Sequence, residues 1–176
     1  MPSAESDQPA DGQTRLIKHF QNHEIEDHAT GWSNLWDTDN SDLWDRGKPS
    51  PALIDLIEQR RDLFHPETPD GKKKKAFVPG CGRGYDAVML ALHGFDVYGL
   101  DVSARGVMLA REYAATELAR PQAYNFGSAW VSAEKESQGE VTFLEGDFFQ
   151  SDWEVEIQFD LIYDYTVRFP APFLLL

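Results

Sequence analysis

The sequence is poor in cysteine and in basic residues. Cys81 is the single cysteine among 176 residues, so no disulfide can form within the chain, and this usage is typical of a reducing compartment. Lysine and arginine number 16 against 30 aspartates and glutamates, which leaves a net charge of -14. A protein this acidic repels the phosphates of nucleic acid and of anionic membranes, so neither is an expected partner.

Long apolar runs are also absent. No stretch could span a bilayer, and the first residues are acidic where a secretory signal needs a basic region followed by an apolar one. We therefore expect a cytoplasmic protein. Residues 1–14 contain little that could enter a core, which predicts a disordered acidic tail. The length predicts one domain, over 15–166, followed by an apolar tail over 167–176.

The strongest pattern lies in the middle of the chain. A short apolar run predicts a buried strand, a glycine-rich turn follows, and apolar residues at helical spacing predict a helix before a second strand that closes on an acid. This order is the first half of a nucleotide-binding βαβ unit. The five features occupy residues 76–78, 79–84, 85–93, 96–100 and Asp101.

The glycine spacing separates two kinds of nucleotide site. A dinucleotide site has G-x-G-x-x-G, whereas here Gly84 follows Gly80 and Gly82 one residue early, which disfavours NAD. The turn instead resembles the glycine loop of class I methyltransferases, which bind S-adenosylmethionine (SAM). The resemblance implies that Asp101 accepts hydrogen bonds from both ribose hydroxyls of SAM. A carboxylate can accept two donors at once. An ordinary glycine-rich turn followed by an acidic loop residue is the alternative.

The chain after this unit predicts further elements. Apolar spacing predicts an earlier helix over 51–64, and Ser103 is a candidate N-cap for a helix after Asp101. Residues 120–139 are mostly polar and predict a surface excursion. Apolar runs at 141–144 and 159–163 predict the third and fourth strands.

Tryptophans are concentrated near the N-terminus. Three of the five fall within a short stretch, at Trp32, Trp36 and Trp44. Trp32 and Trp36 are one helical turn apart, so their rings share a face. They either pack an N-terminal helix onto the sheet or form an aromatic lid over a cationic ligand such as the SAM sulfonium.

These tryptophans, the W-D-R-G-x-P segment at 44–49 and the V-P-G-C-G-x-G-Y-D loop at 78–86 together resemble the thiopurine methyltransferase family. Within it the likeness is strongest to the thiol and halide methyltransferase branch of plants and fungi, and it covers about residues 30–166. The resemblance implies a Rossmann-like α/β sheet with an N-terminal helical lid, a SAM cofactor, and methyl transfer to a small thiol, hydrosulfide or halide. The cofactor contacts that it implies are Trp32, Trp36, Trp44, Gly80, Asp101, Asp147, Phe148 and Tyr165.

The end of the sequence departs from that family. A complete sheet of this class has seven strands, and this chain predicts about four. Pro170 and Pro172 would break the helix expected there. One edge of the fourth strand should then face water, which predicts marginal stability and self-association. The alternative function is therefore an inactive methyltransferase-like fragment, or an interaction partner of a full-length methyltransferase. A nicotinamide-dependent oxidoreductase is a third hypothesis.

Three other sets of residues were candidates for a metal site, a nucleophile and a general base, and the sequence supports each of them less. His19 and His23 lie one helical turn apart, but no third ligand is in register, so we expect no metal site. Cys81 lies within the cofactor loop without a paired histidine, which favours a packing role over a nucleophile. Asp164 is either a general base or a residue that orients its loop, so no catalytic residue is assigned.

Overall fold

The computed structural model describes residues 12–21, 23–24, 27–38, 40–130, 138–150, 153 and 157–165. The chain forms two compact units, Met1–Arg46 and Gly47–Leu176, where the sequence predicted one domain over 15–166. The division falls at exposed Gly47 and Lys48, which bury little surface and are typical of a boundary. The predicted apolar tail over 167–176 lies outside the described residues.

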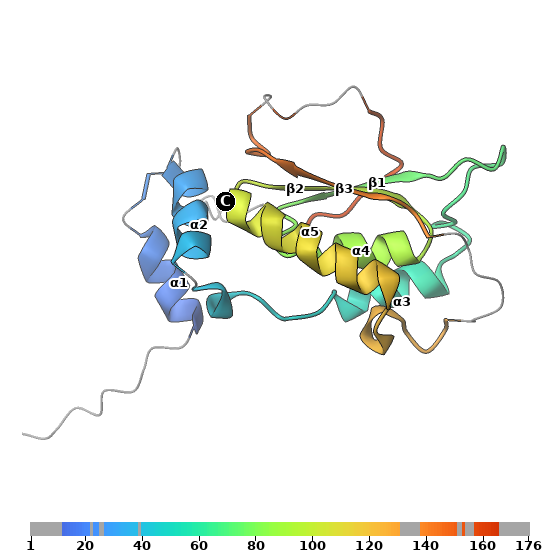
Figure 1. Ribbon diagram of the computed structural model, residues 1–176, viewed down its shortest axis with the longest axis horizontal. Coiled ribbons are helices and arrows are strands. Elements are labelled where there is room, and N and C mark those ends of the chain that lie inside the picture. Colours follow the sequence, from blue (N-terminus) through green and yellow to red (C-terminus); the bar gives the residue numbers. More distant parts are fainter. Residues whose placement is uncertain are drawn as a thin grey trace, which may run out of the picture. The chain divides into compact units, whose positions relative to one another are not determined.

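The N-terminal unit is helical. It contains α1 (Gly12–Phe20), α2 (His28–Asp37) and the short 3-10 helix η2 (Ser41–Leu43) (Figure 1). α1 begins inside the span that the sequence predicted to be a disordered tail, and the part of that span before α1 is not described. Leu16 is buried in this unit, whereas Ile17 beside it on α1 is 46% exposed.

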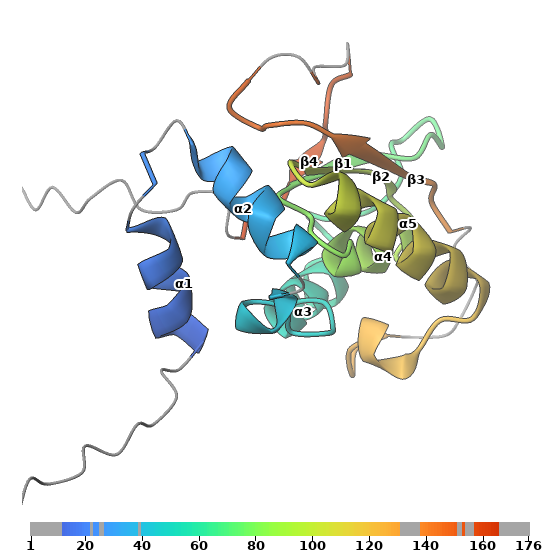
Figure 2. The same cartoon turned by 60° about the vertical axis from the view of Figure 1, so that its left-hand side comes forward.

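The C-terminal unit is a Rossmann-like α/β layer built on four parallel strands. Their order is β3-β2-β1-β4, as Figure 2 shows. The strands are β1 (Lys75–Pro79), β2 (Asp96–Asp101), β3 (Val141–Glu145) and β4 (Leu161–Ile162). The four predicted strands are confirmed, and the fold is that of an incomplete class I sheet.

Helices connect the strands and cover one side of the sheet. α4 (Tyr85–Leu92) joins β1 to β2, and α5 (Ala104–Ala119) joins β2 to β3. Both helices lie on the same side of the sheet in Figure 1. Ser103 is the N-cap of α5, as predicted, because its Oγ accepts a hydrogen bond from the Gly106 N–H at 3.1 Å.

Two shorter helices complete the described part of this unit. α3 (Pro51–Gln59) ends earlier than the predicted span 51–64, because Arg60 leaves the helical region with φ -115° and ψ 45°. The 3-10 helix η3 (Ala123–Asn125) follows α5. None of the described helices is both long enough and apolar enough to cross a membrane.

The two faces of the sheet are covered differently. Ala76 and Val78 of β1 belong to the core that α3, α4 and α5 close. Phe77, which lies between them, points to the other face because side chains alternate along a strand. There its ring stacks on Trp153 at 5.2 Å and on Phe159 at 4.9 Å between centroids. Helices therefore bury one face, and aromatic rings cover part of the other.

The fourth strand was predicted over 159–163 with one edge facing water, and the exposure of its described residues agrees with that prediction. β4 has only Leu161 and Ile162, and Ile162 is 60% exposed. β4 pairs with β1, where the Tyr163 N–H donates to the Phe77 carbonyl at 2.9 Å. Among the described residues nothing pairs with its other edge, so a short strand with an apolar residue in water ends the sheet.

The glycine turn between β1 and α4 needs its glycines. Gly80, Gly82 and Gly84 have φ of 59°, 53° and 76°, a region that other residues rarely enter. Gly84 is also crowded, because a Cβ there would meet the Phe143 ring at 2.7 Å and the Ala110 Cβ at 3.2 Å. The turn therefore approaches β3 and α5 more closely than a side chain would allow.

Gly84→Ala is expected to lower the free energy of unfolding by about 2–4 kcal/mol, from backbone strain together with overpacking against Phe143. Urea unfolding followed by circular dichroism measures this loss. Gly71→Ala is the matched control, because Gly71 has φ 78° but nothing within 4 Å of an added Cβ. It should show the backbone strain alone, and equal losses for the two variants would contradict the crowding at Gly84.

Candidate functional site

The candidate site lies at the carboxyl ends of three neighbouring strands. β1 runs into the glycine turn, β2 ends at Asp101, and β3 is followed by Gly146 and Asp147. The sheet register places these ends side by side, because Asp101 is opposite Glu145 and the Gly146 N–H donates to the Asp101 carbonyl at 3.0 Å. Ligands of open parallel sheets bind at this edge.

Asp101 is the most tightly held acid at this edge. Its Oδ2 accepts a hydrogen bond from the Gly82 N–H at 2.8 Å, and its Oδ1 accepts one from the Ser103 N–H at 3.0 Å. The residue is 7% exposed, and burial raises the pKa of its carboxyl while the two N–H donors oppose that rise. A carboxylate offers about four lone-pair sites, so two remain for a ligand.

Gly80 occupies the exposed start of the turn that Asp101 fixes. The Cys81 N–H donates to the Leu100 carbonyl at 2.9 Å, and the Gly84 N–H donates to the Cys81 carbonyl at 2.8 Å. With the Gly82 bond to Asp101, these contacts join the turn to the end of β2. The glycine turn and Asp101 are thus joined into one hydrogen-bonded unit.

Cys81 is expected to react slowly with alkylating reagents. Burial and the nearby negative charge of Asp101 raise the pKa of the thiol well above its ordinary value, so little reactive thiolate is present. Alkylation by iodoacetamide at pH 8 should be at least about tenfold slower in the native chain than in the urea-unfolded chain. Equal rates would contradict the packing role.

The residues after β3 form a tight turn. The Asp147 Oδ1 accepts a hydrogen bond from the Phe149 N–H at 2.9 Å, so its side chain closes its own turn. Phe148 is 37% exposed, and its ring lies 6.2 Å from Phe77 and 6.0 Å from Trp153. Both residues lie at the predicted edge of the sheet. Their contacts with an adenine ring stay a prediction.

Tyr165 follows the end of β4 and is 53% exposed. Its ring is nearly parallel to that of Tyr163, with centroids 6.3 Å apart. Because β4 pairs with β1, Tyr165 and the glycine turn both follow the carboxyl ends of adjacent strands. Asp164 is exposed beside it, and its role as a general base or as a residue that orients its loop stays a prediction.

The three predicted tryptophans form one cluster within the N-terminal unit. The Trp44 ring lies edge-on to Trp32 at 5.4 Å and to Trp36 at 5.3 Å, both with interplanar angles of 83°. Trp36 is 4% exposed, and Phe20 of α1 approaches Trp32 at 4.8 Å. The prediction that Trp32 and Trp36 share a face is consistent with their common partner, Trp44. Their role as a lid stays a prediction.

The histidines of the same unit make packing contacts. His19 Nε2 lies 3.0 Å from the Gly31 carbonyl, and His23 Nδ1 lies 2.8 Å from the His19 carbonyl. The two rings are tilted against each other, with centroids 4.8 Å apart. Across the described part of the chain, no group of three or more His, Cys, Asp and Glu side chains could hold a metal ion.

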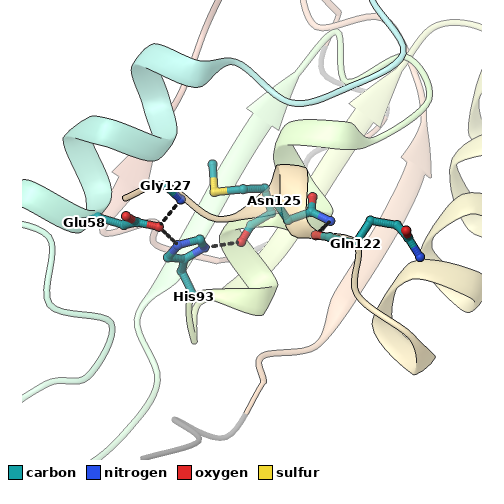
Figure 3. Close-up of polar contacts among 6 residues, drawn as sticks. Glu58, His93, Gln122, Asn125 and Gly127 are labelled. Atoms are coloured by element: carbon teal, nitrogen blue, oxygen red, sulfur yellow. Dashed lines mark hydrogen bonds and ion pairs between the residues drawn. The ribbon is translucent and has the colours of Figure 1, made fainter. Parts of the chain in front are cut away.

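The sequence analysis missed a buried polar cluster, shown in Figure 3. The Glu58 Oε1 accepts a hydrogen bond from the Gly127 N–H at 2.6 Å and lies 3.2 Å from His93 Nε2. The other ring nitrogen, His93 Nδ1, lies 2.8 Å from the Met89 carbonyl. Both side chains of the pair are almost fully buried, at 0% and 2% exposed.

A second acid holds the same segment. The Glu117 Oε1 accepts hydrogen bonds from Asn125 Nδ2 at 2.6 Å and from the Gln122 N–H at 2.5 Å. Asn125 is fully buried. The predicted surface excursion over 120–139 agrees with the exposure of residues 120–124 and 128–129, and Asn125 is a buried exception within it; residues 131–137 lie outside the described part.

This cluster supports the fold and lies away from the candidate site. α4 starts after the glycine turn at the carboxyl end of β1 and ends at His93, shortly before β2 begins. His93 is therefore at the amino end of the parallel strands, the edge opposite Asp101. A signal was present in the sequence, because Glu58 shares the buried face of α3 with Ile54 and Ile57.

The protein-family model described as "Thiopurine S-methyltransferase (TPMT)" matches residues 27–170 of this chain. The chain belongs to the thiopurine S-methyltransferase family. The resemblance drawn from the tryptophans and the glycine loop is confirmed. Most of both described units lies within the matched range.

Curated relatives are similar in sequence to this member of the thiopurine S-methyltransferase family. "Probable thiol methyltransferase 2" of Arabidopsis thaliana is 35% identical over 141 residues, which is 80% of this chain and 49% of that protein. "Thiocyanate methyltransferase 1" of Brassica oleracea is 33% identical over 137 residues, which is 78% of this chain and 47% of that protein. The chain thus spans about half the length of these relatives.

Among solved structures, a magnesium protoporphyrin IX methyltransferase of Synechocystis PCC 6803 is 17% identical, with a TM-score of 0.47. The match covers 94% of this family member and 67% of that chain. A structure titled for the conversion of a disulfide bond into a thioacetal group during echinomycin biosynthesis is 27% identical. Its TM-score is 0.44, and the match covers 70% of this chain and 38% of that one.

Proposed function

We propose that this chain binds SAM and transfers its methyl group to a small soft nucleophile, namely a thiol, hydrosulfide or halide. The observation that carries the proposal is the geometry of Asp101, a buried carboxylate held by the N–H groups of Gly82 and Ser103 at the end of β2. Family membership and the similarity to proteins named thiol and thiocyanate methyltransferases support it.

The residues at this edge fit the proposed cofactor. Asp101 has lone-pair sites left for two ribose hydroxyls, and the open backbone of Gly80 lets a ligand come close. Asp147 and Phe148 would bind the adenine, as the resemblance implies. The proposed contacts with the remainder of the cofactor come from Trp32, Trp36, Trp44 and Tyr165.

Bound SAM would supply an electrophilic methyl carbon, and the protein would supply alignment. A thiolate, hydrosulfide or halide arrives as an anion, so little acid–base help is needed. Holding the nucleophile in line with the methyl group, in a site that excludes water, is then the main contribution of the side chains. We accordingly propose no general base and no metal, and we propose a cytoplasmic location with a small-molecule substrate.

A second candidate rests on β4. Among the described residues nothing pairs with the outer edge of β4, and Ile162 is 60% exposed there, so backbone groups and an apolar side chain are available to another chain. The alternative is therefore an inactive methyltransferase-like chain that self-associates or pairs with a full-length methyltransferase.

Calorimetric titration with S-adenosylhomocysteine (SAH) tests the proposal, followed by transfer of labelled methyl from SAM to a thiol, to hydrosulfide and to iodide. Saturable SAH binding with turnover of one acceptor would support it. No SAH binding by a chain that circular dichroism shows to be folded would withdraw the enzyme assignment. Sedimentation velocity then decides whether the folded chain self-associates as the second candidate expects.

A further inference from the structure

One buried hydrogen-bond donor of the C-terminal unit has no acceptor. The indole Nε1 of Trp153 is removed from water, and no acceptor for its N–H lies within the described part of the chain. Trp153 belongs to the connection between β3 and β4. Native folds keep few buried donors of this kind, so this one indicates a partner that the described residues do not supply.

The indole packs directly on the backbone at the end of β3. A Cβ added at Gly146 would meet three atoms of Trp153, namely Cβ at 2.6 Å, Cγ at 3.1 Å and Cδ1 at 3.2 Å. Because Cδ1 is bonded to Nε1, the side of the indole that carries the donor is the side nearest to Gly146. A larger residue than glycine would prevent this approach.

The donor therefore lies beside the groups proposed to bind the cofactor. The Gly146 N–H donates to the Asp101 carbonyl at 3.0 Å. Asp147 and Phe148 follow Gly146 directly in the chain. The Phe148 ring lies 6.0 Å from that of Trp153, with 20° between the two planes. Trp153 is thus next to the residues proposed for the ribose and for the adenine.

Aromatic stacking accounts for the ring of Trp153 but not for its N–H. Phe77 of β1 is buried and stacks on the indole, with centroids 5.2 Å apart and 15° between the planes. A phenylalanine at position 153 could stack in the same way. The N–H is the part of this side chain that packing leaves without a role.

We propose that Trp153 is a further cofactor-binding residue, whose Nε1–H donates to a ring nitrogen of the adenine beside the exocyclic amine. This inference rests on the proposed function, in which Asp147 accepts a hydrogen bond from that amine. A carboxylate only accepts and an indole N–H only donates. Adenine presents a donating amine between two accepting ring nitrogens, N1 and N7, so the two side chains match neighbouring atoms of the base.

This pairing would select adenine over other purines. Guanine and hypoxanthine carry a carbonyl oxygen in place of the amine, which would bring an acceptor to the carboxylate of Asp147. Because Nε1 is buried, the base reaches it only when a neighbouring ring turns aside. Phe148 is the partly exposed ring in contact with Trp153, so it is the ring that moves.

Two substitutions at position 153 remove the donor. Trp153→Phe keeps an aromatic ring for the stack on Phe77, while β-(3-benzothienyl)alanine keeps the size of the indole and has sulfur in place of the N–H. Trp130→Phe is the matched control for loss of the larger ring, because Trp130 lies edge-on to His93 at the opposite edge of the sheet. If Trp153→Phe fails to fold, the benzothienyl variant carries the test.

Calorimetry with SAH and its deaza analogues is the first readout. The native chain should lose about tenfold in affinity when carbon replaces one of the two ring nitrogens beside the amine. Both variants at position 153 should bind SAH about tenfold more weakly than the native chain, and should bind that analogue as they bind SAH. The 3-deaza analogue and Trp130→Phe are the controls, and neither should distinguish the variants from the native chain.

The stability of the chain without SAH is a second readout. A donor that lacks an acceptor does not stabilise the fold, so the benzothienyl variant should have a urea midpoint no lower than that of the native chain. A lower midpoint would show that the N–H has a partner within the fold and would overturn the inference. Native-like SAH affinity in both variants would overturn the inference alone. If the native chain binds no SAH, the proposed function fails and the inference falls with it.

Discussion

Glu58→Ala is expected to lower the free energy of unfolding by about 3–5 kcal/mol, the loss typical of breaking one side of a buried charged pair. The substitution leaves His93 and the Gly127 N–H without their acceptor in the interior. It also leaves a cavity between α3 and the loop that carries Gly127. Both effects weaken the contact between α3 and this loop, so both contribute to the decrease in the free energy of unfolding.

The hydrogen-bond pattern shows why the pair is sensitive. The Met89 carbonyl can only accept, so His93 Nδ1 carries a proton. The contact between His93 Nε2 and Glu58 Oε1 at 3.2 Å needs a further proton between the two atoms. Glu58→Gln keeps an oxygen for the Gly127 N–H and has an amide N–H to donate to His93 Nε2, so its loss should be smaller, about 1–3 kcal/mol.

Urea unfolding measures these losses, with Asp55→Ala on the exposed side of α3 as the control. The control should change stability by less than about 0.5 kcal/mol. If Glu58→Ala lowered the free energy of unfolding no more than Asp55→Ala does, the contact between Glu58 and His93 would not stabilise the fold as described. Because the pair lies at the opposite edge of the sheet from Asp101, folded Glu58→Gln should bind SAH as the native chain does.

Asp101→Ala is expected to weaken SAH binding by about 100-fold to 10,000-fold. Each hydrogen bond to a charged group contributes about 1.5–3 kcal/mol, and the proposed ribose contacts number two. The variant also removes the acceptor that holds Gly82, so the turn loses its anchor to β2. Calorimetry measures the affinity, and circular dichroism checks that the variant folds. Binding within about tenfold of the native chain would contradict the proposed role.

The pH dependence of SAH binding gives an independent check on Asp101. Burial raises the pKa of this carboxyl above 3.8, so it takes up its proton at a higher pH than an ordinary aspartate. SAH affinity should fall as the pH is lowered through that raised pKa, because the protonated group has fewer acceptor sites. Asp101→Asn should bind weakly without this dependence, and a pH-independent native affinity would contradict the assignment.

The same titration acts on stability with the opposite sign. The folded state binds the Asp101 proton more readily than the unfolded state, whose aspartate has the ordinary value of 3.8. The contribution of Asp101 to stability is therefore full below that value and is lost as the pH rises through the raised folded pKa. Ligand binding and stability then change in opposite directions over one pH window.

Local sequence patterns were enough to predict the central βαβ unit. The apolar run before the glycines, the helical spacing after them and the acid at Asp101 all lie within one short stretch, so each element is specified by its neighbours. Ser103 was equally accessible, because an N-cap acts on residues only a few positions away. The order of the strands then follows from the parallel crossovers.

Contacts between distant residues could not be predicted in this way. Local sequence patterns could not predict the contact of Ser50 with Asp86 or of Glu58 with His93, because the two residues of these pairs are 36 and 35 positions apart. The burial of Asn125 within a mostly exposed, polar segment could not be predicted either, because it depends on the hydrogen bond to Glu117, eight positions earlier. The short length of β4 depends on pairing partners rather than on its own apolar residues.

The ring of Phe143 has a consequence for how this sequence can change over time. A Cβ added at Gly84 or at Gly99 would meet this ring at 2.7 Å, so three positions on β3, β2 and the glycine turn share one volume. A larger residue could become fixed at either glycine only after position 143 had accepted a smaller one. A substitution of Phe143 on β3 must therefore come before a substitution of Gly84 or Gly99. Phe143 thus limits sequence change in the glycine turn, although β3 is not part of that turn.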